Sequence, residues 1–186
     1  MKKGKLFVIS GPSGAGKGTI CKKVLETDSN IKFSVSMTTR SPREGEVNAV
    51  DYHFTDKESF LNLIEEGGLL EHNCYLDNYY GTPKKQVMQW IESGHDVILE
   101  IDYHGAIQVR EAYPECIMIF IMPPSVEELK QRLCGRGSET EDVINKRLEE
   151  ACNDIAHADM YDYCVVNEDV ESATAQVLEI MKDKED

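Results

Sequence analysis

One lysine stands at the end of a glycine-rich run that could hold the phosphates of a nucleotide. The run Gly11-Pro12-Ser13-Gly14-Ala15-Gly16-Lys17-Gly18-Thr19 follows the apolar residues 6–9 and precedes a helix-like stretch over 17–26. Glycines let backbone N–H groups turn toward an anion, and the start of a helix adds unpaired donors and a positive dipole end. Lys17 would add a cationic charge for the β- and γ-phosphates. The alternative is an ordinary glycine turn between a strand and a helix.

The match to the usual phosphate-loop pattern is imperfect at one position. Gly18 stands where a hydroxyl residue usually follows the lysine, and the hydroxyl comes one residue later, at Thr19. In the usual pattern that hydroxyl binds Mg²⁺ directly. A direct ligand is therefore in doubt, and coordination through water stays open. The Gly-Lys-Gly-Thr variant resembles nucleoside monophosphate kinases.

A second candidate anion site lies in residues 34–46. Arg40 and Arg43 are three residues apart, hydroxyl residues precede them, and Pro42 stiffens the link between them. Guanidinium groups match phosphate oxygens in a bidentate geometry. The alternative is a hydroxyl-rich loop with solvated arginines.

The charge is acidic overall but unevenly distributed over the 186 residues. Net charge is −14; residues 1–50 hold nine Lys and Arg against four Asp and Glu, whereas 51–140 hold seven against sixteen and 141–186 four against fourteen. An acidic body argues against binding to nucleic acid or to anionic membranes. The basic excess near the glycine-rich run suits a small anionic ligand.

The composition predicts one reduced, cytoplasmic domain with room for an insertion. The longest apolar run, 116–122, is far shorter than the roughly 18 residues of a membrane span. Six cysteines form no C-x-x-C pair, and no histidine pair has zinc spacing. We expect reduced thiols and no structural metal.

Buried strands alternate with helices along most of the chain. Strands are expected at 6–10, 97–101, 116–121 and 163–166, and helices at 17–26, 83–93, 125–133, 141–158 and 170–181. This alternation predicts an α/β fold with a parallel sheet and helices on both faces. Residues 33–81 interrupt this alternation of buried strands and helices. Strand candidates there are 33–36, 51–54 and 69–75, and a helix is expected at 57–66. They indicate an inserted α+β subdomain, and 134–139 indicates a mobile loop.

Several segments taken together resemble the guanylate kinases over the whole chain. They are residues 34–46 (Ser-Val-Ser-x-Thr-Thr-Arg-x-Pro-Arg-x-Gly-Glu), 51–54, 80–82, 101–106, 123–125, 132–140 and 165–167. The resemblance implies a P-loop core at 1–32 and 84–186, a lid at about 126–141 and a GMP-binding insert at 33–83. It also implies transfer of the γ-phosphoryl group of ATP to GMP or dGMP, with Mg²⁺ as cofactor.

The resemblance also implies roles for individual residues. The catalytic residues would be Lys17, Arg132, Arg136 and Arg147. ATP would be held by residues 11–19 and, at its adenine, by Asn167. The GMP phosphate would be held by Arg40, Arg43, Tyr52 and Tyr80, and the guanine by Ser36, Glu71, Thr82 and Asp102. Glu100 or Asp102, at the end of a buried strand, would organise Mg²⁺ through water.

Purely structural roles are an alternative for most of these residues. The arginines could pair with nearby acids, the tyrosines could be packing aromatics, and Glu71 could be a solvated surface acid. For Glu71 the functional case is chemical, because one carboxylate can accept from both N1–H and the 2-amino group of guanine, and adenine lacks that pair of donors. His104 stands where the family usually has glutamine, and Ser138 where the lid usually has threonine.

Two competing functions remain at this stage. Guanylate-kinase-like domains also serve as peptide-binding scaffold parts, but those typically lose the ATP-site residues that this chain keeps. A kinase of another monophosphate, such as AMP, conflicts with Glu71 and with the Ser36 and Thr82 hydroxyls. The sequence does not predict oligomeric state, dGMP preference or regulation.

Overall fold

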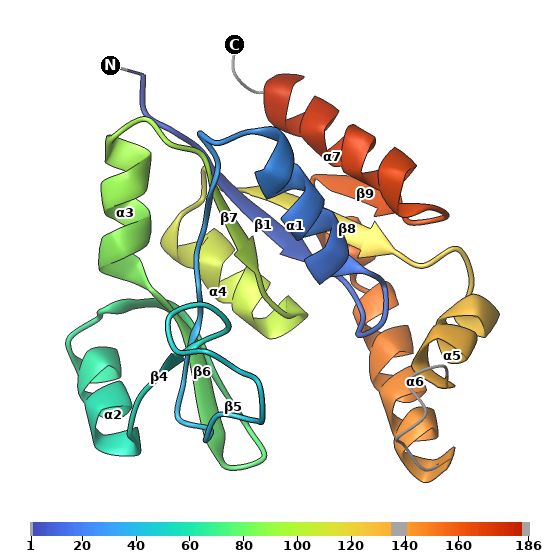
Figure 1. The fold of residues 1–186 in the computed structure, drawn as a ribbon, viewed down its shortest axis with the longest axis horizontal. Helices are drawn as coiled ribbons and strands as arrows, with labels where there is room; N and C mark the ends of the chain where they lie inside the picture. Colours follow the sequence, from blue (N-terminus) through green and yellow to red (C-terminus); the bar gives the residue numbers. More distant parts are fainter. Residues whose placement is uncertain (1, 135–140, 184–186) are drawn as a thin grey trace. The chain divides into compact units, whose positions relative to one another are not determined.

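The computed structural model describes residues 2–134 and 141–183 of the chain (Figure 1). These residues fall into two compact units. The first unit holds residues up to 6, 30–99 and 104–116, and the second holds 7–29, 100–103 and the residues from 117 onward. The predicted insert, 33–83, lies wholly within the first unit; its exact boundaries stay a prediction.

The second unit is built on a ladder of parallel strands. Strand β8 (Ile117–Met122) pairs with β1 (Leu6–Ser10) on one side and with β9 (Tyr163–Val166) on the other. Every residue of β1 is buried, as expected for a parallel strand covered on both faces. The sequence prediction of a parallel sheet is confirmed.

Helices flank this ladder. Helix α1 (Lys17–Thr27) packs against α7 (Val170–Asp183), and the two lie side by side in Figure 1. Helix α5 (Val126–Cys134) packs against α6 (Glu141–Ile155) through Leu129, Leu133 and Ala151. Helix α6 ends three residues before the predicted end at 158, where a short 3₁₀ helix (Ala158–Met160) begins.

The first unit combines a parallel pair with a separate mixed sheet. Strand β2 (Lys32–Phe33) is parallel to β7 (Val97–Glu100). The mixed sheet has the order β4 (His53–Phe54), β3 (Met37–Thr38), β6 (Asn78–Pro83), β5 (Leu69–Tyr75). The helices are α2 (Lys57–Glu65), α3 (Lys84–Glu92) and α4 (Tyr103–Ala112). Helix α2 begins as predicted, with Asp56 accepting from the N–H of Ser59 at 2.8 Å.

Three sequence predictions about local structure were wrong or incomplete. The single strand expected at 33–36 is two strands, because the chain leaves β7 after residue 34 and joins the mixed sheet at Met37. Strand β6 and helix α4 were not identified. Helix α3 starts at Lys84, because Pro83 is extended and pairs with Leu69.

No helix in the described part of the chain is long and apolar enough to cross a membrane.

Candidate functional site

The glycine-rich loop joins β1 to α1, and two of its glycines are required by its shape. Gly16 has φ +95°, and a Cβ there would lie 2.4 Å from Nδ2 of Asn167. Gly11 has φ +143°, and a Cβ there would lie 2.3 Å from the carbonyl oxygen of Ile121. These positions exclude larger residues by both backbone conformation and space. The loop is thus a shaped structure rather than an ordinary turn.

Lys17 is held beneath this loop. Its Nζ donates to the carbonyl oxygens of Gly11 at 2.6 Å and Pro12 at 3.1 Å. Burial lowers the pKa of Lys17, while the nearby carboxylate of Glu100 opposes that shift. A cavity of about 300 Å³ lies above the lysine; its lining residues are Ser13, Gly14, Gly16, Lys17, Gly18, Thr19 and Glu100. A cation that is costly to bury lines the same cavity as the glycines of the loop, an arrangement that favours an anionic ligand.

Two of the predicted catalytic arginines reach the surroundings of this loop. Arg147 donates to the hydroxyl of Ser13 at 2.6 Å. Arg132 donates to the carboxylate of Glu128 at 2.8 Å and to the backbone carbonyl of Asn167 at 3.0 Å. The predicted pairing of an arginine with a nearby acid therefore holds for Arg132. Arg136 lies outside the described residues.

Asn167 supports the loop from beneath. The residue is 2% exposed, and its Nδ2 donates to the carbonyl oxygen of Ala15 at 2.7 Å. Its Oδ1 has no hydrogen-bond partner among the described residues. Buried polar atoms of this kind are rare in folded proteins, so Oδ1 is a candidate acceptor for a ligand donor. The resemblance predicted the adenine of ATP at this residue.

Glu100, the last residue of β7, is suited to help hold a metal ion that binds together with a nucleotide. A Cβ at Gly18 would lie 3.5 Å from the Glu100 carboxylate, so this carboxylate faces the start of α1. Burial raises the pKa of Glu100, and Lys17 opposes that shift. The described residues contain no group of three or more acidic, histidine or cysteine side chains able to hold a metal by themselves. Mg²⁺ commonly uses one or two carboxylates, waters and substrate phosphates, which matches this donor set.

The second candidate site centres on Arg40 in the first unit. Its guanidinium makes a bidentate pair with the Glu46 carboxylate, at 2.8 and 3.0 Å. Its Cζ lies 5.5 Å from the ring centroid of Tyr52, and Tyr52 meets Tyr80 edge-on at 6.1 Å. The structure therefore groups three of the four residues predicted for the GMP phosphate.

Glu46 is a partner that the sequence analysis did not identify. It also accepts from the backbone N–H of Arg43 at 2.7 Å, and the hydrogen bond from Arg40 lowers the pKa of Glu46. Its place at the end of the 34–46 motif was the available signal. Arg43 itself is exposed.

Glu71 lies on β5 and is buried. It is 6% exposed, so the alternative of a solvated surface acid is wrong. The hydroxyl of Thr82, itself 1% exposed, donates to Oε1 of Glu71 at 2.6 Å. Ser36 is half-buried just before β3, and Asp102 follows β7 in the second unit.

Comparison with known proteins identifies what this arrangement resembles. The family model described as guanylate kinase matches residues 3–184. The guanylate kinase of Oceanobacillus iheyensis is 50% identical over 97% of this chain and 88% of its own length, and that of Clostridioides difficile is 52% identical over 95% and 86%. The crystal structure of guanylate kinase from Anaplasma phagocytophilum superposes with a TM-score of 0.80 at 36% identity, covering 98% of this chain and 87% of that one.

Proposed function

The chain belongs to the guanylate kinase family, and we infer that it transfers the γ-phosphoryl group of ATP to GMP, giving ADP and GDP. The observation that carries this inference is the presence of two anion sites of different design. One is a backbone loop with Lys17, and the other is a guanidinium site around Arg40 with a buried carboxylate at Glu71. We expect dGMP to be accepted as well.

On the ATP side, the chain's own groups would act by binding and charge stabilisation. The N–H groups of residues 11–19 would hold the β- and γ-phosphates, and Lys17 would leave its carbonyl partners to bind them. Arg132 and Arg147, together with Arg136, would stabilise the charge on the transferring phosphoryl group. Asn167 would accept from the adenine amino group through Oδ1 while keeping its bond to Ala15. No covalent intermediate with the protein is needed, because positioning and electrostatics suffice for direct in-line transfer.

Mg²⁺ is the expected cofactor, since kinases that use ATP generally need a divalent metal. When bound with the nucleotide, it would neutralise charge on the β- and γ-phosphates. Glu100, and with it Asp102, would hold its water ligands from the end of β7. Gly18 in place of a hydroxyl residue is compatible with this indirect arrangement.

On the GMP side, Arg40, Arg43, Tyr52 and Tyr80 would hold the phosphate. The guanine would be recognised by the following residues: Ser36, Glu71, Thr82 and Asp102. A carboxylate has two acceptor oxygens with about four lone-pair sites, so Glu71 can keep its bond from Thr82 and accept from guanine. Adenine would leave this buried charge facing an edge without matching donors.

The expected partners are therefore ATP, GMP and dGMP, with neither nucleic acid nor membrane. The acidic composition supports this expectation, because polyanions would be repelled. The described cysteines form no disulfide, which agrees with the reducing cytoplasm where these nucleotides are used.

A panel of monophosphates tests the proposed function. ATP, Mg²⁺ and GMP, dGMP, AMP, CMP or UMP are mixed with the protein, and ADP release is followed. Release that depends on GMP and dGMP, with AMP far weaker, is the expected result. ATP turnover that is no faster with GMP than without it would overturn the enzyme assignment and favour the peptide-binding one.

A further inference from the structure

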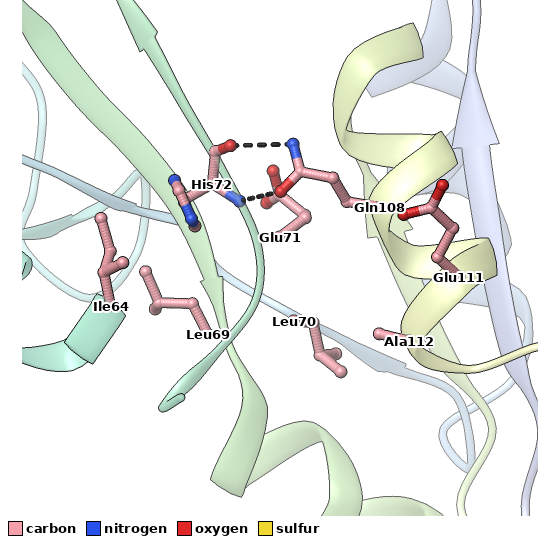
Figure 2. Close-up of a pocket in the computed structure, with 8 residues that line it drawn as sticks. All are labelled: Ile64, Leu69, Leu70, Glu71, His72, Gln108, Glu111 and Ala112. Atoms are coloured by element: carbon pink, nitrogen blue, oxygen red, sulfur yellow. Dashed lines mark hydrogen bonds between the residues drawn. The ribbon is translucent and has the colours of Figure 1, made fainter. Parts of the chain in front are cut away.

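A glutamine of α4 is hydrogen-bonded to both backbone groups of a single residue of β5. Gln108 accepts from the N–H of His72 through Oε1 at 3.1 Å and donates to the carbonyl oxygen of His72 through Nε2 at 2.9 Å (Figure 2). A carboxamide carries the same donor and acceptor as a peptide group. Gln108 therefore binds the strand as another strand would, although it comes from a helix 36 residues away in sequence.

The bonded residue directly follows Glu71 at an irregular point of the sheet. The register of β5 on β6 shifts between Leu69 and His72. Leu70 and Glu71 are consecutive, yet they are 5% and 6% exposed. In a regular strand, neighbouring side chains point to opposite faces, so this irregularity changes where the Glu71 side chain is directed.

Strand β5 also lies at the edge of its sheet, in the order β4-β3-β6-β5. An edge strand has one side without a neighbouring strand, and an irregular segment at that edge has more freedom than a central one. Gln108 supplies the missing partner at the residue where the regular register resumes. Thr82, from β6, holds the Glu71 side chain itself.

We propose that Gln108 is a positioning residue for base selection: by fixing the backbone at His72, it fixes the carboxylate of Glu71 for guanine. This inference rests on the guanine-binding role proposed above for Glu71. Gln108 would not touch the substrate. It would act through the strand, and its loss would weaken GMP recognition without changing the ATP side.

The surroundings of Gln108 allow its removal without collapse of the unit. A cavity of about 440 Å³ adjoins it; the lining is Ile64, Leu69, Leu70, Glu71, His72, Gln108, Glu111 and Ala112 (Figure 2). Water entering this space can satisfy the released N–H and carbonyl groups of His72. The chain should therefore fold, while the segment that carries Glu71 samples more positions.

Gln108→Leu is the test, because leucine has a similar size but no hydrogen-bonding group. The two hydrogen bonds to His72 are lost, together with a longer one to the carbonyl oxygen of His104 at 3.4 Å within the same helix. The loss of the two bonds to His72 should raise the KM for GMP by roughly five- to thirtyfold, while the KM for ATP stays within about twofold. The preference for GMP over AMP should fall by a similar factor. Gln108→Glu keeps an acceptor for the His72 N–H but places a carboxylate oxygen against the His72 carbonyl oxygen, so it should raise the KM for GMP at least as much as Gln108→Leu does.

Glu111→Gln is the matched control, because Glu111 lies on the same helix and lines the same cavity. It should behave as the wild type. Circular dichroism and thermal unfolding establish whether each variant is folded. If Gln108→Leu does not fold, Gln108→Glu takes its place in the test.

Glu71→Gln, measured in parallel, separates the possible failures. If Glu71→Gln loses GMP preference and Gln108→Leu behaves like Glu111→Gln, the positioning role is overturned and the guanine role of Glu71 stands. If Gln108→Leu raises both KM values equally, its role is structural only, which also overturns the inference. If Glu71→Gln behaves like the wild type, neither the guanine role of Glu71 nor the positioning role of Gln108 stands. If the wild-type protein itself shows no turnover that depends on GMP, the proposed function is overturned.

Discussion

Gly16→Ala is a sharp test of how the phosphate loop is built. The backbone of Gly16 has φ +95° and ψ 14°, in the left-handed region that residues with a Cβ rarely adopt. The new Cβ would lie 2.4 Å from Nδ2 of Asn167, a separation that real Cβ atoms do not show. Asn167 would have to move, and its 2.7 Å bond to Ala15 would break.

The expected cost has two parts. Left-handed backbone at a residue with a Cβ costs about 1–2 kcal/mol. The broken bond leaves a buried amide and a carbonyl without partners, which costs about 1–3 kcal/mol. The free energy of unfolding should therefore fall by about 2–5 kcal/mol. ATP should also bind more weakly, because the N–H groups of the loop are displaced.

A double-mutant cycle separates the two parts. Asn167→Ala alone should cost about 1–3 kcal/mol, because it removes the same bond without the strain. In Gly16→Ala/Asn167→Ala the steric conflict is absent and the bond is lost only once. The double variant should therefore be about as stable as Gly16→Ala alone. Urea unfolding of all four proteins at one pH gives the cycle.

Gly67→Ala is the control for backbone strain. Gly67 has φ +65°, and nothing lies within 4 Å of a Cβ built there, so only the backbone cost of about 1–2 kcal/mol applies. The reasoning is refuted if Gly16→Ala costs no more than Gly67→Ala. It is equally refuted if the costs of Gly16→Ala and Asn167→Ala simply add in the double variant.

Three further variants test other contacts. Lys17→Met should abolish GMP-dependent ADP release but leave GMP binding intact, as calorimetry would show. The variant also loses the hydrogen bonds to the carbonyl oxygens of Gly11 and Pro12, so the informative measurement is the pH dependence of stability. Because burial lowers the pKa of Lys17 from 10.5, the unfolded wild-type chain binds that proton more tightly, and the proton destabilises the folded wild type below the lowered pKa. The stability of the wild type relative to Lys17→Met should therefore rise as pH rises from the lowered pKa toward 10.5, and a stability difference that does not change with pH would contradict the argument. Arg40→Lys should raise the KM for GMP about tenfold or more, with the KM for ATP unchanged, because lysine cannot reproduce the bidentate pair with Glu46; equal rises in both constants would exclude a GMP-side role. Thr82→Val should lower the free energy of unfolding by about 1–3 kcal/mol, since it removes a buried donor from Glu71; an unfolding midpoint unchanged in urea would show that the contact contributes nothing.

The features that the sequence predicted well are those that short segments determine. The strand, loop and helix around Lys17 follow one another directly, and glycine spacing alone indicates the turn between them. The parallel strands β1, β8 and β9 are apolar runs that need no partner to be identified. Helix α5 carries its own start signal, because a serine before a helix commonly accepts from a backbone N–H of the first turn, and Ser125 accepts from the N–H of Glu128 at 3.0 Å.

The features that the sequence did not predict depend on distant partners. Strand β6 contains Gly81 and ends at Pro83, which disfavour strands on local grounds, so only its pairing with β3 and β5 makes it a strand. Gln108 is an ordinary helix residue until the fold brings His72 to it. The burial of Glu71 was not predicted from its own strand, because Glu71 lies at a shift in register that is a property of two strands together.

The acidic partners of the arginines resolve an apparent conflict in this chain. A protein of net charge −14 that binds highly charged nucleotides should need its arginines unpaired, yet Arg40 is engaged by Glu46 and Arg132 by Glu128. A guanidinium has five N–H donors. In Arg40 the Glu46 carboxylate takes two of them and the carbonyl oxygen of Ser41 takes a third, whereas in Arg132 Glu128 and the carbonyl of Asn167 are both bonded through one terminal nitrogen. The remaining donors are held in a fixed plane, so a phosphate bound there would meet an ordered group, and the arginine would lose less side-chain entropy on binding. We therefore interpret Glu46 and Glu128 as groups that reduce the net positive charge of the arginines but fix the orientation of their N–H donors. In-line phosphoryl transfer depends on the orientation of the groups that hold the phosphates.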